Sequence, residues 1–408
     1  MTGANHVIWT ETRAHGNGLV LVVDLRLLAG VAVAIALIAV PTLAAPLGRL
    51  ASPFALLVAL PPLAIVLEAF GWRERLAGRI ARVRPVLLRL LASYAAWAFT
   101  SSVLTLDVAA VAAASVGIAV AGHDHEERRW QLGGAILGAN VGSLLLPFSN
   151  LTNLVLVAGS GLSFAAYVRL AIWPQIAAAM AVGLLFAMRA RRSLGPRAGE
   201  PGTTIVESET DAVTVKPDPL AGVAGAVTLA GAAGAIACGL TGRDMAVPFA
   251  MAAGTLAGIA VATGRLGIGR LARAIPPAGL AVIGFATIAS GPIATAAGML
   301  PRPDGTLAGL TLALVAGGLL SVLANNLPAA FGAIWLLGAH PATIVAYLIG
   351  TNVVAVATPH GSVATILARA VAERHGVATP VGAYLRVGWQ YAAIGSLAGM
   401  AALTVVAR

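Results

Sequence analysis

The sequence predicts an all-α polytopic membrane protein with two inverted repeats, each containing a re-entrant hairpin and a discontinuous transmembrane helix. Composition, a polar linker in mid-chain and two similar proline motifs predict this fold. The chain has 408 residues, of which 59% are hydrophobic and 10% charged, and its mean hydropathy is +0.89. Soluble proteins carry about a quarter charged residues. Most of this chain is therefore expected to lie in a bilayer.

Apolar windows long enough to cross a bilayer predict the helices in order. They cover residues 19–40, 52–70, 131–160, 169–188, 219–240, 245–264, 276–299, 341–368 and 386–406. Two further apolar stretches, 86–121 and 306–338, are too long for one crossing. A helix over 86–121 would be about 54 Å long, against a hydrocarbon core of about 30 Å.

Each long stretch must turn at its polar middle, either as two short crossings or as a re-entrant hairpin. The first middle holds Thr100 to Asp107, and the second holds Ser321 and Asn325 to Pro328. Neither has the composition of a loop at a headgroup surface. The sequence therefore favours hairpins with their tips inside the membrane.

Residues 189–218 are polar and rich in Pro and Gly, which predicts a cytoplasmic linker. They separate a first repeat, 1–188, from a second, 219–408. Three short segments of the first repeat each match a segment of the second repeat, and the matches follow the same order along the chain. The number of residues between the two members of a matched pair changes little from one pair to the next. The pairs are Ser102–Ala110 with Ser321–Ala329, Gly138–Asn153 with Gly350–Thr365, and Ala166–Leu170 with Ala383–Val387.

Arginine clusters predict the orientation of the spans. They are expected to lie in short loops, at Arg73–Arg84, Arg189–Arg197, Arg265–Arg273 and Arg369–Arg374, and the positive-inside rule assigns them all to the cytoplasm. Counting spans between the clusters turns the two repeats in opposite directions, as in secondary transporters of the plasma membrane. The same clusters account for the formal charge of +10 without a nucleic-acid partner.

The two proline motifs point to a binding site. Asn140 precedes Pro147, and Asn352 precedes Pro359, by seven residues each. A proline among Ser, Asn and Gly interrupts a helix, and the freed backbone groups must line a cavity or bind something at membrane depth. The helix N-termini exposed there favour oxygen ligands or anions. The predicted substrate-binding residues are Ser149, Asn150, Thr152, Asn153, Thr358, Gly361 and Ser362, together with Asn325 and Asn326 of the second hairpin tip.

Asp107 is the only carboxylate deep in an apolar stretch. A buried carboxylate is costly and indicates function by default, and an apolar environment favours its protonated form. Asp107 is therefore expected to exchange a coupling proton. The competing interpretation is a structural acid that caps a helix over 107–121. His360 is a second candidate for coupling, because histidine is the residue type that serves as a pH switch in proteins, or else it is a hydrogen-bonding residue only.

Other kinds of site are not expected. His123 and His125 resemble a metal-ligand pair, but they lie in a charged stretch, 123–129, which predicts a solvated loop. The single cysteine, Cys238, lies in an apolar window, which excludes a disulfide and a thiolate metal cluster. A membrane-embedded enzyme would need a second acid, a Ser/Lys pair or a zinc motif at depth. We therefore expect a transporter with no cofactor or metal rather than an enzyme.

The chain resembles the ion transporter superfamily and is most similar to its arsenite/antimonite efflux permeases. The likeness covers most of the chain after about residue 60 and is carried by Ser149–Asn153, Ser321–Pro328 and Thr358–Thr365. It implies elevator-like alternating access and the extrusion of arsenite or antimonite against protons. By position, it implies a pocket of Asp107, Ser149, Asn150, Asn153, Asn325, Asn326, Thr358, Gly361 and Ser362.

A sodium- or proton-coupled transporter of a carboxylate or other small anion is the alternative. The doubled Ser-Asn-Thr tip signature of carboxylate symporters is absent from residues 102–108 and 321–328. The partners to consider are a small inorganic oxyacid or anion, the coupling ion and the lipid bilayer. A transport ATPase subunit and a second copy of the chain, in a homodimer, are further candidates.

Overall fold

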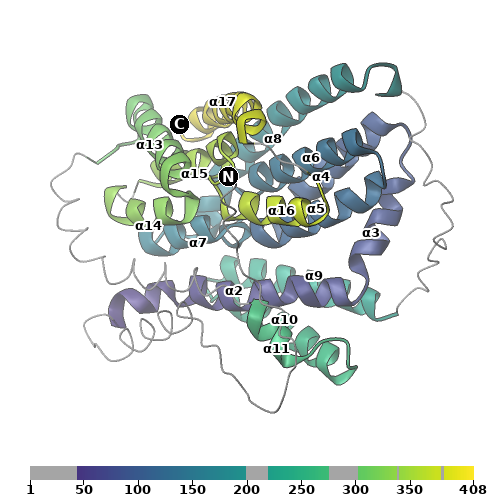
Figure 1. Ribbon diagram of the computed structural model, residues 1–408. Coiled ribbons are helices and arrows are strands. Elements are labelled where there is room, and N and C mark those ends of the chain that lie inside the picture. The colour runs from purple at the N-terminus through teal and green to yellow at the C-terminus, as the bar shows by residue number, and fades with distance from the viewer. Residues whose placement is uncertain (1–43, 199–218, 275–301, 338–339, 378–380) are drawn as a thin grey trace, which may run out of the picture.

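A computed structural model describes residues 44–198, 219–274, 302–337, 340–377 and 381–408, and these residues form helices and turns without a strand (Figure 1). Five helical segments are long and apolar enough to cross a membrane, which identifies a multi-pass membrane protein. They are Val86–Val103, Phe164–Leu194, Pro219–Leu240, Leu307–Ala324 and Leu385–Val406. The windows expected over 19–40 and 276–299, and most of the predicted linker, lie outside the described residues.

The helices of the first half surround one interruption. They are α2 (Ala44–Ala69), α3 (Trp72–Ala81), α4 (Val86–Val103), α5 (Leu106–Ala121), α6 (His125–Gly142), α7 (Leu151–Ser160) and α8 (Phe164–Leu194). The short 3-10 helix η2 (Pro147–Ser149) lies between α6 and α7, and η3 (Gly195–Ala198) follows α8.

The helices of the second half show a similar order. They are α9 (Pro219–Leu240), α10 (Ala246–Ala262), α11 (Ile268–Ala274), α13 (Leu307–Ala324), α14 (Asn326–Leu336), α15 (Pro341–Val353), α16 (Val363–Arg374) and α17 (Val381–Val406). The 3-10 helix η4 (Val354–Ala357) follows α15. Both proline motifs therefore interrupt a helix, as the sequence predicts.

The two halves are interleaved. Within each half, the first hairpin arm packs along the helix before the interruption, so that α4 lies on α6 and α13 lies on α15. Between halves, α5 packs on α16 and α14 packs on α7, while α8 lies along α17. The helices α2, α9 and α10 pack on one another at one side of this assembly (Figure 1).

Glycines allow the close packing of the hairpin arms. A Cβ atom on Gly138 would lie 2.6 Å from the carbonyl oxygen of Tyr94 in α4. A Cβ atom on Gly350 would overlap the carbonyl oxygen of Leu314 in α13 in the same way. Small residues at membrane helix interfaces permit such backbone contact. The two glycines occupy the same position in the two proline motifs, so each half uses the same device.

Three predicted boundaries are wrong. Helix α3 occupies most of the arginine-rich loop expected at 73–84, and α8 continues through the first residues of the predicted linker to Leu194. Helix α6 begins at His125 rather than 131, because Asp124 caps it by accepting hydrogen bonds of 3.0 Å from the backbone N–H groups of Glu126 and Glu127. The charged stretch 123–129 is therefore largely helical.

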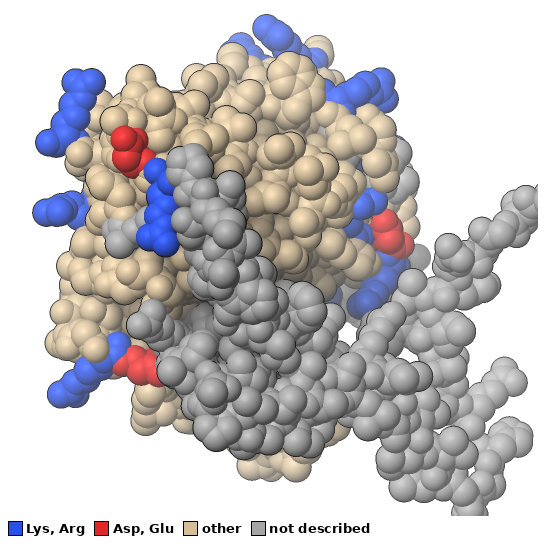
Figure 2. Space-filling model, turned by 90° about the vertical axis from the view of Figure 1, so that its left-hand side faces the viewer, with Lys and Arg blue, Asp and Glu red and all other residues tan. Residues whose placement is uncertain are grey.

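Much of the surface is apolar. On the part of the face in Figure 2 that is not grey, most of the area is tan, the colour of residues other than Lys, Arg, Asp and Glu. Along α13, large apolar side chains are exposed one after another, with Leu323 at 69% and Leu307 at 67%. Such a helix surface is suited to hydrocarbon rather than water.

Candidate functional site

The two interruptions have equivalent helix caps. Asn150 caps α7, and its side-chain Oδ1 accepts a 3.1 Å hydrogen bond from the backbone N–H of Thr152. Ser362 caps α16, and its Oγ accepts a 3.1 Å hydrogen bond from the backbone N–H of Thr365. The two caps occupy matching positions in the two proline motifs, as Asn140 and Asn352 do.

Asn352 brings the two interruptions into direct contact. Its Oδ1 accepts hydrogen bonds of 3.0 Å from Asn150 Nδ2 and from Thr152 Oγ1. Its Nδ2 donates a 2.7 Å hydrogen bond to Asn153 Oδ1. All four side chains are buried, with Asn352 and Asn153 at 0% exposure. Three of the predicted substrate-binding residues therefore meet around one amide from the other half of the chain.

Asn140 makes the corresponding contact from the first half. Its Nδ2 approaches Thr365 Oγ1 at 3.4 Å and also donates to the carbonyl oxygen of Ile136 at 2.8 Å. Asn140 and Asn352 are matching positions of the two motifs, and so are their partners Thr365 and Asn153. In each contact, the Asn of the Gly-x-Asn element in one half therefore hydrogen-bonds the residue at one and the same later position of the motif in the other half.

Ser149 and Asn153 satisfy backbone groups that the first interruption frees. Ser149 Oγ donates to the carbonyl oxygens of Ser143 and Leu146, at 2.6 and 2.7 Å. Asn153 Nδ2 donates to the same Ser143 carbonyl at 2.6 Å. Buried carbonyls outside a helix need such partners, so these two predicted site residues also hold the unwound segment in shape.

The second hairpin tip is bonded to the second interruption. Asn325 has a φ of +86°, and its Nδ2 donates to the carbonyl oxygen of His360 at 2.8 Å. The backbone N–H of Asn326 and the hydroxyl of Ser321 both donate to the carbonyl oxygen of Gly361, at 2.9 and 3.0 Å. Three more of the predicted substrate-binding residues, Asn325, Asn326 and Gly361, therefore lie together.

Gly361 and His360 both shape this contact. A Cβ atom on Gly361 would overlap the carbonyl oxygen of Ala355 and lie 2.9 Å from Thr358 Oγ1. The ring of His360 is exposed, and its Nε2 lies 2.7 Å from the carbonyl oxygen of Val322 in α13. His360 thus hydrogen-bonds the hairpin that its own backbone also contacts.

The first hairpin tip is arranged differently. Thr105 is the cap residue of α5, and Asp107 is the second residue of that helix, close to its positive end. The Asp107 side chain is half-buried and makes no hydrogen bond or ion pair with any other described residue. The tip is held instead by Ser102 Oγ, which donates to the Gly142 carbonyl at 2.7 Å and accepts from Gln175 Nε2 at 2.7 Å. Asp107 therefore stands apart from the contacts around Asn352.

The contacts also give the register between the two hairpins. Ser101 Oγ donates to the carbonyl of Ala139 at 2.7 Å, and Ser321 Oγ donates to that of Thr351 at 3.2 Å. Ser101 and Ser321 are thus equivalent, and the cap residues Thr105 and Asn325 follow them at the same distance along the chain. In this register Asp107 corresponds to Leu327, whereas the sequence match of Ser102 with Ser321 puts Asn326 opposite it.

Two buried acceptors near the interruptions have no hydrogen-bond partner among the described residues. They are Thr358 Oγ1 and Asn140 Oδ1, on residues that are 7% and 0% exposed. Unpaired buried oxygens of this kind are available to a ligand that donates hydrogen bonds. Within the described part of the chain, no group of three or more His, Cys, Asp or Glu side chains is arranged to hold a metal ion.

Asn140 and Asn352 are absent from the predicted set of site residues. Both belong to the repeated Gly-x-Asn element, so the repeat itself was the signal that could have identified them. They lie within continuous helix, at α6 and α15, and nothing local distinguishes them from structural amides.

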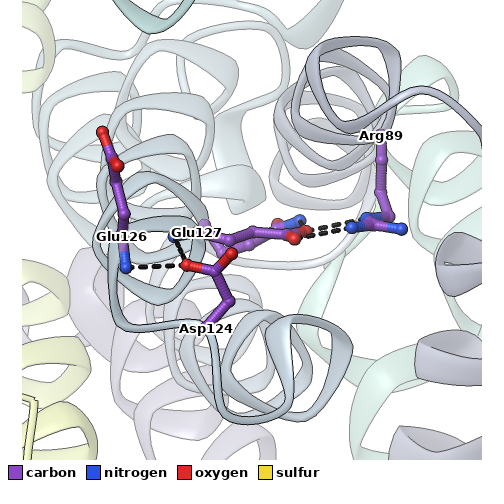
Figure 3. Close-up of polar contacts among 5 residues, drawn as sticks. Arg89, Asp124, Glu126 and Glu127 are labelled. Atoms are coloured by element: carbon purple, nitrogen blue, oxygen red, sulfur yellow. Dashed lines mark hydrogen bonds and ion pairs between the residues drawn. The ribbon is translucent and has the colours of Figure 1, made fainter. Parts of the chain in front are cut away.

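A buried ion pair between α4 and α6 is a further feature that sequence reasoning missed. Arg89 Nε donates to Glu127 Oε1 at 2.7 Å, and an Arg89 terminal nitrogen donates to Glu127 Oε2 at 2.5 Å (Figure 3). Glu127 is 2% exposed, so it is more deeply buried than Asp107, and the expected solvated loop at 123–129 is wrong for this residue. The charged neighbours of Glu127 in the sequence hide this pairing with a residue 38 positions away.

No protein-family model matches this chain. No curated protein matches it in sequence either. The two helix interruptions and their contacts are therefore the features from which a function can be inferred.

Proposed function

We propose that this protein is a secondary active transporter of the ion transporter superfamily type, and that it exports arsenite and antimonite across the plasma membrane in exchange for protons. The observation that carries the proposal is the set of hydrogen bonds that joins Asn352 to Asn150, Thr152 and Asn153. Two interrupted helices from opposite halves of the chain meet there through amides and hydroxyls. Paired interruptions of this kind are typical of a transporter's binding site.

Equivalent elements in the two halves support an inverted repeat. The hairpin α4–α5, the interrupted helix α6–α7 and the final helix α8 are followed in the same order by α13–α14, α15–α16 and α17. The contacts cross between halves in a reciprocal way, because α5 packs on α16 and α14 packs on α7. Two units related by a pseudo-twofold axis exchange partners in this manner.

Helix lengths support re-entrant hairpins over pairs of full crossings. The second arm of the second hairpin, α14, has 11 residues, or about 16 Å at 1.5 Å per residue, against a hydrocarbon core of about 30 Å. Its tip is also hydrogen-bonded to the interior segment around Gly361 rather than lying free. The arm α5 is longer, at 16 residues, but its cap at Thr105 is likewise buried.

The chemistry around the interruptions favours a neutral hydroxylated substrate. Residues 140–153 and 350–365 contain no lysine or arginine. A carboxylate taken into this site would lack a cationic partner, which is costly in a buried environment. Arsenite and antimonite are uncharged trihydroxy acids at neutral pH, and their hydroxyl groups both donate and accept hydrogen bonds. The unpaired oxygens Thr358 Oγ1 and Asn140 Oδ1 suit such donors.

Asp107 is the proposed coupling residue. It is half-buried at the first hairpin tip and makes no hydrogen bond or ion pair with another described side chain, so it is open to protonation. Its position in the first turn of α5 also lets the helix stabilise its charged form. In this proposal, His360 affects coupling indirectly. Its ring hydrogen-bonds the second hairpin and so helps to hold the tip of that hairpin in place.

The test is arsenite and antimonite resistance in a bacterial host that lacks its own efflux system. Cells that express the chain are expected to survive higher arsenite concentrations and to accumulate less arsenite than cells with an empty vector. Asp107→Asn is expected to abolish this protection at an equal level of membrane-inserted protein.

Each outcome bears on a separate part of the proposal. Unchanged sensitivity with well-expressed wild-type protein would overturn the metalloid assignment. Proton- or sodium-driven uptake of a labelled dicarboxylate by the same cells would favour the alternative, a carboxylate transporter. Full protection by the Asp107→Asn variant would overturn only the coupling role.

A further inference from the structure

One face of α4 carries polar groups at every turn. Arg89, Ser93, Trp97 and Ser101 are spaced four residues apart, so they lie on one side of the helix. All four are buried, with exposures of 4%, 1%, 0% and 0%. An interior helix face in a membrane protein is usually apolar. Buried polar side chains such as these four need hydrogen-bond or ion-pair partners.

The partners at the two ends of the row lie on α6. Arg89 binds Glu127 at one end (Figure 3), and Ser101 donates to the Ala139 carbonyl at the other, and both pairs are 38 residues apart. The two helices therefore run side by side in one register over this length. In that register, Ser93 lies level with Gln131, which is 1% exposed.

The two middle residues of the row, Ser93 and Trp97, have polar atoms without hydrogen-bond partners among the described residues, and so has the neighbouring Gln131 of α6. These atoms are Ser93 Oγ, Trp97 Nε1 and Gln131 Oε1, and all three are buried. Gln131 uses its other amide atom, Nε2, in a 3.4 Å contact with Glu127 Oε1. Helix α5 lies against both Gln131 and Trp97, because a Cβ atom on Gly117 would lie 3.0 Å from Gln131 Cβ and because Trp97 packs in one apolar cluster with Ala113 and Val116.

We propose that α4, α5 and α6 enclose a binding site for water between Ser93, Trp97 and Gln131. Trp97 Nε1 can only donate, Gln131 Oε1 can only accept, and the Ser93 hydroxyl can do either. A single water molecule, which typically makes about three hydrogen bonds when buried, satisfies all three groups. A metal cation does not fit, because the indole N–H can only donate a hydrogen bond and because the positively charged residue Arg89 precedes Ser93 by one helical turn.

The site belongs to this hairpin rather than to the shared architecture. With Ser101 matched to Ser321 in α4 and α13, Ser93 and Trp97 correspond to Ala313 and Gly317. With the proline motifs matched, Gln131 corresponds to Thr343, whose hydroxyl is already satisfied by a 2.7 Å hydrogen bond to the His340 carbonyl. At the equivalent positions, the described residues of the second half therefore carry no unpaired polar group. The packing of these helices does not by itself require Ser93, Trp97 and Gln131. The inference does not depend on the transported substrate.

Radiolytic footprinting of the full-length protein in nanodiscs tests the site. An X-ray pulse generates hydroxyl radicals from bound water in place, so a buried aromatic side chain is oxidised quickly only beside an internal water molecule. Trp97 is the reporter, and Tyr347 is the reference because it is 1% exposed and its hydroxyl is satisfied by the Ala329 carbonyl at 2.7 Å. We expect Trp97 to be oxidised several-fold faster than Tyr347.

Variants identify the groups that hold the water. Ser93→Ala and Gln131→Leu are each expected to slow the oxidation of Trp97 to the rate of Tyr347. Ser396→Ala, which removes another buried serine hydroxyl on α17, is the matched control and is expected to change nothing. A Trp97 rate in the wild-type protein that equals the Tyr347 rate would overturn the proposal, as would a fast rate that neither Ser93→Ala nor Gln131→Leu reduces. The wild-type comparison stands even if one variant fails to fold.

Discussion

The side-chain amide of Asn352 donates a 2.7 Å hydrogen bond to the side-chain oxygen of Asn153, 199 residues away in the sequence. Each residue belongs to one of the two interrupted helices, and both side chains are fully buried. This contact joins the two halves of the chain beside the two helix interruptions. The stability of the protein and its proposed transport site therefore depend on the same side chains.

Asn352→Ala is expected to destabilise the protein strongly. The change leaves Thr152 Oγ1 and Asn153 Oδ1 without the hydrogen bonds that Asn352 provides, and each unpaired buried group costs about 1–3 kcal/mol. Asn140→Ala is the matched control, since Thr365 Oγ1 keeps its 2.9 Å contact with Ser362 Oγ. Thermal unfolding of both variants in detergent is expected to show a clearly larger drop in midpoint for Asn352→Ala. Equal drops would contradict a central role for Asn352.

Two glycine substitutions in α6 are expected to act in opposite directions. Gly138→Ala puts a Cβ atom 2.6 Å from the Tyr94 carbonyl oxygen, and backbone atoms there cannot move aside easily. Overpacking of this kind costs about 1–3 kcal/mol. Gly133→Ala meets nothing within 4 Å, and alanine in a helix interior is favoured over glycine by about 1 kcal/mol. Thermal midpoints measured side by side decide the matter, and a stabilising Gly138→Ala would show that α4 and α6 are not in backbone contact.

Glu127→Gln is expected to cost far more stability than the same change at Glu68. Both carboxylates pair with arginine, but Glu127 and Arg89 have side-chain exposures of 3% and 5%, whereas Glu68 has 58% and lies 3.7 Å from Arg73. Breaking a buried pair leaves a charge without compensation and costs about 3–5 kcal/mol, while an exposed pair contributes about 0–1 kcal/mol.

A double substitution separates the charge from the packing at this pair. Replacing both residues by apolar ones of similar size, Arg89→Met with Glu127→Leu, is expected to restore part of the loss seen in Glu127→Gln, because no unpaired charge remains. Denaturation curves of the single and double variants provide the comparison. A double variant less stable than Glu127→Gln would mean that the hydrogen bonds and packing of the pair stabilise the fold, in addition to the compensation of one charge by the other.

Cross-linking tests which elements move together during the proposed transport cycle. Four hydrogen bonds hold the second hairpin tip to the second interruption, so these two parts are expected to move as one body. Gly318→Cys in α13 with Val354→Cys in η4, joined by a disulfide in a Cys238→Ser background, should therefore leave arsenite export intact, because a Cβ atom on Gly318 would lie 3.1 Å from Val354 Cβ and neither residue belongs to the proposed binding site.

A second cross-link is the matched comparison. Phe148 of η2 packs edge-on against Phe249 of α10 with 5.1 Å between the ring centres. Joining cysteines at these two positions ties the interrupted helix to the neighbouring group of α2, α9 and α10, and is expected to block export until the link is cleaved. Export by both linked proteins would contradict a movement between these groups, and a block by both would place the movement at the hairpin tip.

Local features of the chain account for what sequence reasoning predicted correctly. The apolar windows within the described residues became helices, and Pro147 and Pro359 lie at interruptions, because a proline lacks the N–H group that continues a helix. Pro174 lies inside the continuous helix α8, so the Ser, Asn and Gly residues around the two motif prolines contribute to the interruptions as well. The hairpin turns also fall near the polar residues at Thr105 and Asn325. Helix ends were less accurate, as at His125, where a single capping aspartate moved the start by more than a turn.

The sequence by itself therefore determined that this is a helical membrane protein with two broken helices, since composition and proline act over a few residues. Only the tertiary structure decided which polar groups meet. Asn352 pairs with Asn153, and Arg89 with Glu127, because distant helices pack in a particular register that glycines such as Gly138 permit. A buried amide or charge costs free energy until its partner is in place, and that partner is 199 residues away in one case and 38 in the other. No local pattern carries that information.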